Sequence, residues 1–481
     1  MNQTFKKTLS VILAVMMLFG TFAFGASADE VKRIACTMVE DGTSGRGFSW
    51  YTYEDGASDL QIIKTEDFNG DFTGAMNYTG STAKFRDQYI HKVYVNTLEA
   101  GTSYTYRVGD KSKNLWSEIC TVTTDDGDSS FKFVAITDVQ ASSDENFAHA
   151  ALTLKGALSI APDAEFVANF GDFVNDNTND EWDWYFKNFA FANNHYTLVP
   201  ASGNHDGSIT NKFNTNVFQN MFALDESDNQ SVEGVYYSFD YGNAHIAVLN
   251  SNDMYPMTQA QRNWLINDMK SSDATWKIIF MHRAVYSAGK NINKPDTIIM
   301  RNVLLPIIDE PDIDMVYAGH DHMYLRTTQV YGDAAVENVE YVTETFKGEE
   351  ITFAVNPEGT VHALPSTAGT KRYSVNEDAI SPILDVADVA LSTSDWGGCF
   401  AITEIEGGRL VYKAYIVDDE TQEIELIDTY AIKKDEGGKA ESSDLDQSLM
   451  ATIVNYPVNF AKAIIDMLKS YFQMLFDLIG L

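Results

Sequence analysis

The stretch EFVANFGDFVND (165–176) joins a short apolar run directly to Asp172. Apolar runs of this length without alternation suit strands that are covered on both faces. The same arrangement occurs four more times, with FKFVAI (131–136) before Asp138, YTLVPA (196–201) before Asn204, WKIIFM (276–281) before His282, and DMVYA (314–318) before His320 and His322. The sequence therefore predicts buried strands that end in polar side chains.

Two helical stretches lie between these strands, DENFAHAALTLKGALSI (144–160) and TQAQRNWLINDMKSS (258–272). The second begins at Thr258, and Gln261 follows three residues later, which is the spacing of a capping box. Alternating strands and helices predict parallel pairing, and the ligands of such α/β sheets gather beyond the carboxyl ends of the strands. All five polar clusters are expected at such ends.

The residue types at these ends suit a pair of metal ions about 3.5 to 4 Å apart, as in phosphatases and nucleases. Mixed oxygen and imidazole ligands favour Zn, Mn or Fe over Mg or Ca alone. No cysteine lies in these segments, which excludes a thiolate site. In the predicted arrangement Asp172 bridges the two ions, Asp138 and His322 complete the first site, and Asn204, His282 and His320 surround the second.

Each piece has a simpler structural explanation when it is taken alone. A Gly-Asp pair after a strand is commonly a turn, and a histidine near a strand end is commonly a hydrogen-bonded structural residue. Here, however, four of the nine histidines fall in ordered segments with two aspartates and an asparagine. The combination favours a two-metal hydrolase.

This ordered set resembles the calcineurin-like metallophosphoesterases, and GHDHMYLRT (319–327) with MHRAVYS (281–287) resembles their purple acid phosphatase branch. The resemblance covers residues 131 to about 330. It implies a four-layer αββα sandwich of two β-sheets flanked by helices, and a metal-bridging hydroxide that attacks phosphorus in line. It also implies that His205 is not a ligand but stabilises the phosphoryl group or protonates the leaving oxygen.

The chain departs from the purple acid phosphatase pattern at two positions. Those enzymes place a tyrosinate on the first metal three residues after the bridging aspartate, where this chain has Asn175. A purple ferric centre is therefore not expected unless another tyrosine, such as Tyr324 or Tyr286, replaces the missing ligand. Gln140 stands two residues after the first aspartate, where the branch has glycine. We expect Gln140 to ligate the first metal, and the alternative is a hydrogen bond to a ligand.

The chain is strongly acidic. It has 481 residues and a formal net charge of −35, from 34 Lys and Arg against 69 Asp and Glu. Such a chain is not expected to bind nucleic acid through bulk charge. A phosphate ester is nevertheless attracted locally, because two divalent ions, two aspartates and a hydroxide leave about +1 at the centre.

Residues 1–28 read as a secretory signal peptide, in which Lys6 and Lys7 precede an apolar stretch and Ala26, Ser27 and Ala28 form a cleavage site of small residues. A retained transmembrane anchor is the alternative. The predicted location is therefore secreted or extracytoplasmic, and attachment to a cell surface stays open.

Residues 29–126 show strand-like runs and turns without a helical period, which predicts an all-β sandwich. The stretch HKVYVNTLEAGTSYTYRVGD (91–110) resembles the fibronectin type III-like domain that precedes the catalytic domain in many purple acid phosphatases. We expect a separate module that binds a surface, shapes the rim of the active site or serves only for packing.

The phosphoesterase domain is expected over residues 131–434, with strands in 356–373 and 399–419 completing the second sheet. An acidic linker follows over 435–457, and an amphipathic helix over 458–481. Charges interrupt this helix, so contact with a membrane surface or a protein partner fits it better than membrane spanning. Docking on its own domain is the alternative.

Three cysteines occur in the chain. Cys36 and Cys120, in the first and last strands of the sandwich, could meet, but their spacing leaves the disulfide open. Cys399 is expected in a core strand. His362 follows a Gly-Thr turn and is expected at the surface, and the histidines at the remaining positions are likewise not expected in the centre: His91, His149, His195 and His245.

Taken together, the sequence predicts a secreted dinuclear phosphoesterase that acts on phosphomonoesters. A phosphodiesterase or nucleotidase is the near alternative, because the motifs define the metal site and leave the substrate pocket open. The remoter alternative is a surface-binding protein with a structural metal site. His205 distinguishes the last reading, since a structural site has no use for an additional imidazole that is not a ligand.

Overall fold

The computed structural model describes residues 30–435, except 208–215, 225–234, 253–256, 377–382, 384 and 395. The expected signal peptide, C-terminal helix and all but the first residue of the linker lie outside the described residues. Within the described ranges, no helix is both long enough and apolar enough to cross a membrane.

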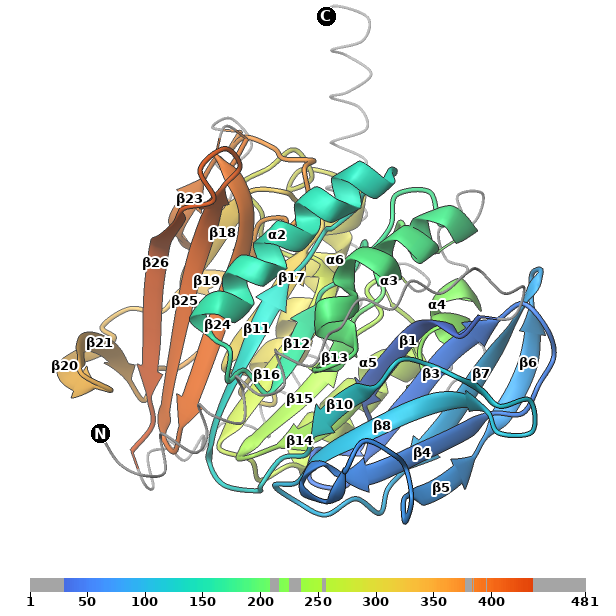
Figure 1. Ribbon diagram of the computed structural model, residues 1–481. Helices are drawn as coiled ribbons and strands as arrows, with labels where there is room; N and C mark the ends of the chain where they lie inside the picture. Colours follow the sequence, from blue (N-terminus) through green and yellow to red (C-terminus); the bar gives the residue numbers. More distant parts are fainter. Residues whose placement is uncertain are drawn as a thin grey trace, which may run out of the picture.

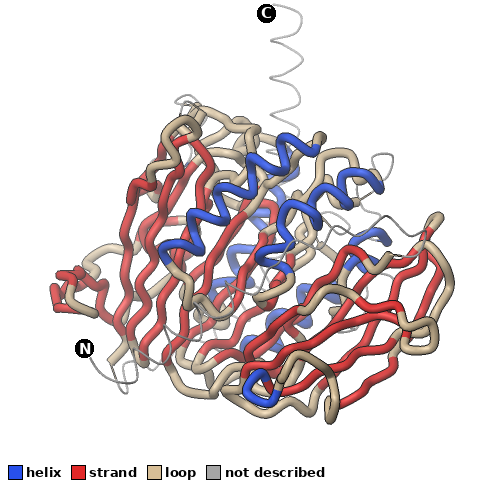
Figure 2. The backbone as a smooth tube through the Cα atoms, in the orientation of Figure 1, coloured by secondary structure: helices blue, strands red, loops and turns tan. Residues whose placement is uncertain are grey.

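Two large mixed sheets pack face to face (Figures 1 and 2). The strands of the first sheet, in spatial order, are β20 (Glu340–Phe346), β21 (Glu349–Val355), β26 (Ile424–Lys433), β25 (Arg409–Asp418), β24 (Gly397–Glu406), β11 (Ser130–Ile136), β12 (Phe166–Asn169), β13 (Thr197–Pro200), β1 (Lys32–Met38), β3 (Arg46–Thr52), β7 (Gln88–Val95) and β6 (Ser81–Phe85). Those of the second are β19 (Ala334–Ala335), β18 (Tyr324–Tyr331), β22 (Thr360–Pro365), β17 (Met315–Gly319), β16 (Trp276–Arg283), β15 (Ala244–Val248), β14 (Tyr237–Tyr241) and β2 (Glu40–Asp41), with β23 (Ala387–Leu391) paired to β18.

Helices cover the outer faces of both sheets, so the expected four-layer αββα arrangement is confirmed (Figure 1). On the first sheet lie α2 (Asp144–Ile160) and α3 (Asn179–Asn193), and on the second lie α5 (Gln259–Ser271) and α6 (Pro295–Asp309). A short helix, α4 (Asn216–Met221), lies between β13 and β14 in the chain.

Local sequence explains where these elements begin. Helix α2 has the bounds expected from its sequence, and the side chain of Ser143 caps its N-terminus by accepting the amide of Asn146. The Thr258 side chain caps α5 through the amide of Gln261. The Gln261 side chain, however, bonds both backbone groups of Asn250 instead of closing a capping box. It thereby ties the helix to the loop after β15.

The five apolar runs form the central strands, and their burial explains the lack of alternation. Strands β11 to β13 pair in parallel, as do β15 to β17. The space between the sheets is filled with aromatic rings that stack or meet edge to face, among them Phe133, Phe166, Phe280 and Tyr317. This packing fixes the two sheets against each other, and with them the strand ends that carry the polar clusters.

The strands after residue 326 correct one expectation. Residues 356–373 do supply β22 to the second sheet, but residues 399–419 form β24 and β25 of the first sheet. Strand β24 pairs antiparallel with β11 over six residue pairs, from Ser130 opposite Glu406 to Ala135 opposite Ala401. The C-terminal strands therefore extend the first sheet beyond β11, on the side of β11 opposite to β12.

The N-terminal residues form the expected all-β sandwich. Its second sheet consists of β10 (Cys120–Thr123), β8 (Ser103–Asp110), β4 (Asp59–Lys64) and β5 (Met76–Thr79), with β9 (Leu115–Trp116) paired to β8. The sandwich has its own hydrophobic core. It is less separate than expected, because β1 pairs in parallel with β13 and β2 with β14, so both large sheets continue into it.

The three cysteines are unpaired and buried, and Cys36 and Cys120 share the core of the sandwich. Cys399 lies in β24, as expected. The surface prediction was wrong for His362, which is 2% exposed and whose pKa burial lowers to about 3. His91, which was expected outside the centre, is buried too: it stacks on Trp50 and bonds Thr52 inside the sandwich. His91 lies on a strand face that the other sheet of the sandwich covers, whereas His362 packs edge to face against Tyr286.

Candidate metal centre

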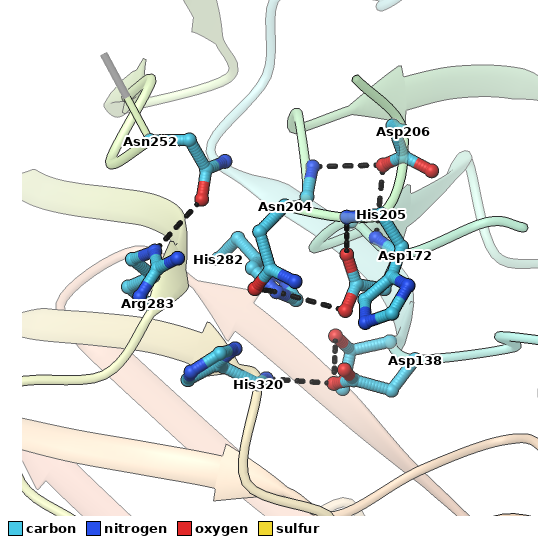
Figure 3. A network of polar contacts seen from close by, with 12 residues as sticks. Asp138, Asp172, Asn204, His205, Asp206, Asn252, His282, Arg283 and His320 are labelled. Carbon is cyan, nitrogen blue, oxygen red and sulfur yellow. Dashed lines mark hydrogen bonds and ion pairs between the residues drawn. The ribbon is translucent and has the colours of Figure 1, made fainter. Parts of the chain in front are cut away.

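Seven predicted ligand residues follow or end five strands, and the fold brings these strand ends to one edge (Figure 3). Several of the backbones there are left-handed, with φ of 52° at Asp138, 53° at Asp172 and 75° at His320. Left-handed backbone is unfavourable for residues other than glycine and occurs where the surroundings impose it. The turns after the strands are thus bent so that the side chains point toward one another.

One group of three ligand atoms lies around Asp172. A carboxylate oxygen of Asp172 and one nitrogen each of His282 and His320 lie within 4.8 Å of one another. The Nε2 atom of His282 is 3.2 Å from Oδ2 of Asp172 and 3.2 Å from Oδ1 of Asn204. These four side chains are the ones predicted for the second site, with Asp172 as the bridge.

A second group lies around Asp138. Its Oδ2 atom accepts hydrogen bonds from the Thr137 hydroxyl and the His320 amide, while its Oδ1 atom is 3.1 Å from Nε2 of His322. The Oδ1 atom of Asp138 and the Oε1 atom of Gln140 are both buried, and neither has a hydrogen-bond partner among the described residues. A buried acceptor without a donor is costly, and a cation held between these atoms would remove that cost.

The orientation of the histidine rings fits the same reading. Nδ1 of His282 donates to the carbonyl of Phe170 at 2.9 Å, and Nδ1 of His322 donates to the carbonyl of Lys371. A neutral ring that donates through Nδ1 carries a lone pair on Nε2. In His322 this lone pair faces a carboxylate oxygen at 3.1 Å, a spacing that suits two ligands each about 2.0 to 2.2 Å from one ion. The donor set therefore fits metal ions.

Burial and charge tune the ionisation of this group. Burial opposes ionisation of Asp172, but the charge and hydrogen bond of His282 hold the pKa of this carboxyl well below its usual range. Burial likewise opposes a charge on His282, yet Asp172 raises its pKa to about 9. Burial and the charges of His282 and Arg283 lower the pKa of His320 well below its usual value, which keeps its imidazole neutral and able to bind a metal.

His205, which was predicted not to be a ligand, lies beside the ligand group around Asp172. Its amide donates to Oδ1 of Asp172 at 2.7 Å, and its Nδ1 lies 2.5 Å from the carbonyl of Asn175. The side chain is half-buried. With Nδ1 bound to a carbonyl, Nε2 is the atom that can exchange a proton with a substrate.

Two buried aspartates support the centre and were missed by sequence reasoning. Asp206 is buried and accepts the amides of Gly203, Asp172 and Phe173, which joins the two loops that carry Asp172 and Asn204. The buried carboxylate of Asp321, between His320 and His322, accepts the Ser287 hydroxyl and the Asn291 amide. The positions of Asp206 in GNHD and of Asp321 in GHDH were the sequence signals that could have identified these two residues.

Arg283 was also missed. Its Nε atom donates to Oδ1 of Asn252 at 3.0 Å, beside His282 and His320 (Figure 3). Its position directly after His282 was the only signal in the sequence.

The missing tyrosinate is not replaced by either tyrosine considered above. The Tyr324 hydroxyl donates to Asp428 at 2.6 Å and the Tyr286 hydroxyl to Asp333 at 2.7 Å. At the position of the family tyrosine, Asn175 contributes its backbone carbonyl to His205.

Two family models match successive stretches of the chain. Residues 131–324 match the calcineurin-like phosphoesterase family, and residues 31–124 match the purple acid phosphatase N-terminal domain.

Several curated proteins are similar in sequence. An uncharacterised protein of Mycobacterium tuberculosis is 25% identical over 208 residues, which cover 40% of this chain and 39% of that protein. Purple acid phosphatase 23 of Arabidopsis thaliana is 25% identical over 54% of this chain and 60% of its own length. Purple acid phosphatase of Glycine max is 23% identical over 69% and 74%. The chain thus spans about two fifths of the mycobacterial relative and more of the plant relatives.

Two solved structures share the fold. Purple acid phosphatase PPD1 from yellow lupin (Lupinus luteus) seeds superposes with a TM-score of 0.66 at 16% identity and covers 85% of this chain and 75% of its own. PhoD superposes with a TM-score of 0.61 at 12% identity, over 93% of this chain and 100% of its own. These matches confirm the expected fold. The chain thus carries a calcineurin-like phosphoesterase domain, preceded by a purple acid phosphatase N-terminal domain.

Proposed function

We propose that this protein is a dinuclear metal-dependent phosphoesterase that hydrolyses phosphomonoesters. The observation that carries the proposal is the pair of buried carboxylates, Asp138 and Asp172, each faced by the Nε2 atom of a histidine at 3.1 to 3.2 Å. A metal ion held between each carboxylate and a neutral imidazole would bind a lone pair from both. The proposal includes export from the cell, supported by the leader-like residues 1–28.

The ligand residues follow from the geometry. Asp172 would hold both ions, since its two oxygens face different neighbours. The first ion would be held with Asp138, Gln140 and His322, and the second with Asn204, His282 and His320. Bound there, two cations lower the pKa of water and polarise the phosphoryl oxygens.

The protein's own groups then have separate tasks. The carbonyls of Phe170 and Lys371 keep the two ligand imidazoles oriented. The Asn175 carbonyl holds the His205 ring so that Nε2 can give a proton to the leaving oxygen. The half-buried position of His205 leaves this atom within reach of a substrate that enters from solvent.

A phosphodiesterase or nucleotidase activity is the nearest competing function, because the same centre serves both ester classes. A structural metal site in a surface-binding protein is the more distant one. Against the latter stands His205, which is held beside the ligands through its amide and ring although it is not one of them.

Metal analysis of the purified protein, combined with a panel of phosphomonoesters and diesters, tests the proposal. We expect about two Fe, Mn or Zn ions per chain and faster turnover of the monoesters. Two bound ions without hydrolysis of any ester would support the structural-site reading, and faster diester turnover would support a phosphodiesterase.

Gln140→Ala is expected to weaken the first metal by about 10-fold and the second by less than about 2-fold, because only the first loses a neighbouring oxygen. The reason is the buried Oε1 atom of Gln140, which has no hydrogen-bond partner in the described residues. Stepwise metal titration followed by calorimetry measures both affinities. Equal weakening of both sites, or of neither, would show that Gln140 is not a ligand.

A further inference from the structure

The predicted centre has a buried side and a more open side. Asp138, Asp172, His282 and His322 are buried, whereas Asn204, His205, His320 and Arg283 are half-buried. A substrate must therefore approach across the second group. Three of its members are predicted ligands or the predicted proton donor, and Arg283 is the remaining one.

Arg283 is held in place by its backbone. It is the last residue of β16 and pairs with Gly319, the residue before His320. Its amide donates to the hydroxyl of Ser251 at 2.8 Å. The backbone of Arg283 therefore lies directly beside the backbones of two predicted ligands, His282 and His320.

The side chain of Arg283 is held as well. Its Nε atom donates to Oδ1 of Asn252 at 3.0 Å, and Nδ2 of Asn252 donates to the carbonyl of Ser202 at 2.6 Å. Asn252 is only 4% exposed. Since Ser202 lies two residues before Asn204, the brace connects the guanidinium to the loop of a predicted ligand (Figure 3).

We propose that Arg283, braced by Asn252, binds the non-bridging oxygens of the substrate phosphoryl group and makes the centre favour phosphomonoesters over phosphodiesters. A guanidinium offers donors in a planar fork that matches two phosphoryl oxygens, and its hydrogen bonds to an anion are strong. The inference rests on the proposed phosphoesterase function and names its substrate class.

The preference follows from charge. At neutral pH the phosphoryl group of a monoester is largely a dianion, whereas a diester is a monoanion. The Coulomb energy between the guanidinium and the substrate scales with the substrate charge. Arg283 therefore contributes more to binding the monoester, at the ground state and in the transition state.

Arg283→Met and Arg283→Lys are compared with the wild-type holoenzyme on p-nitrophenyl phosphate and bis-p-nitrophenyl phosphate, which release the same leaving group. We expect Arg283→Met to lower kcat/KM for the monoester by about 10²-fold and for the diester by less than about 5-fold. Arg283→Lys retains the charge without the fork and should recover part of the loss.

Asn252→Leu removes the brace and keeps the guanidinium. It is expected to shift the ratio of monoester to diester turnover in the same direction by a smaller amount. Lys347→Met is the matched control, because Lys347 pairs with Glu404 and Glu406 on a hairpin away from the centre. It removes the same charge and should leave the ratio unchanged.

Calorimetric binding of inorganic phosphate to the metal-loaded proteins provides a readout that needs no turnover. Arg283→Met is expected to weaken this binding by roughly 10- to 10²-fold at unchanged metal content. Equal losses for both esters, unchanged phosphate affinity, or loss of metal from the variant would each overturn the assignment. If the wild type hydrolyses neither ester, the proposed function fails, and the phosphate measurement still decides whether Arg283 binds the anion.

Discussion

Asp172→Asn is expected to abolish both metal occupancy and hydrolysis. Asp172 is buried, and its two oxygens lie against the His205 amide at 2.7 Å and the His282 ring at 3.2 Å. An amide in its place keeps the size and one acceptor but loses the negative charge that would be shared by two cations. We expect metal content to fall from about two ions per chain toward none, and kcat/KM to fall by at least about 10⁴-fold.

Elemental analysis and turnover measured on the same preparation test this expectation. Asp163→Asn is a suitable control, because Asp163 pairs with Lys132 at the exposed end of β11 and loses the same charge far from the centre. Full metal content in Asp172→Asn would show that the bridge has been assigned to the wrong residue.

His205→Ala is expected to keep both metals and to slow turnover by roughly 10² to 10⁴-fold, the range for a positioned acid or base. The metals stay because the contact of residue 205 with Asp172 is made by its backbone amide, which alanine retains. Turnover falls because the ring held on the Asn175 carbonyl is lost. The effect should be largest with an alkyl phosphate, whose poor leaving group needs the proton.

His195→Ala controls for the loss of an imidazole, since His195 bonds Thr121 on the sandwich side of the molecule. It should turn over every substrate at the wild-type rate. A His205→Ala variant that hydrolyses an alkyl phosphate as fast as the wild type would contradict the proton-donor role, and one that loses its metals would make His205 part of the ligand scaffold.

The sequence by itself determined the elements and the kinds of side chain at their ends. The bounds of α2 follow from its apolar pattern and the Ser143 cap, both of which are local properties. The central strands follow from apolar runs that only a doubly covered sheet can bury. Since parallel strands place their carboxyl ends together, the convergence of Asp138 and Asp172 after β11 and β12 could also be predicted.

The tertiary structure alone decided how distant segments pair and what each polar group contacts. Strand β24 joins β11 across about 265 residues of chain, and β1 continues the catalytic sheet beside β13. No local pattern encodes such neighbours, because register and edge choice depend on which faces remain to be covered. For the same reason the sequence misplaced His362 at the surface. The brace from Arg283 through Asn252 to Ser202 likewise joins the end of a strand to two separate loops, so only folding could bring its hydrogen-bond partners together.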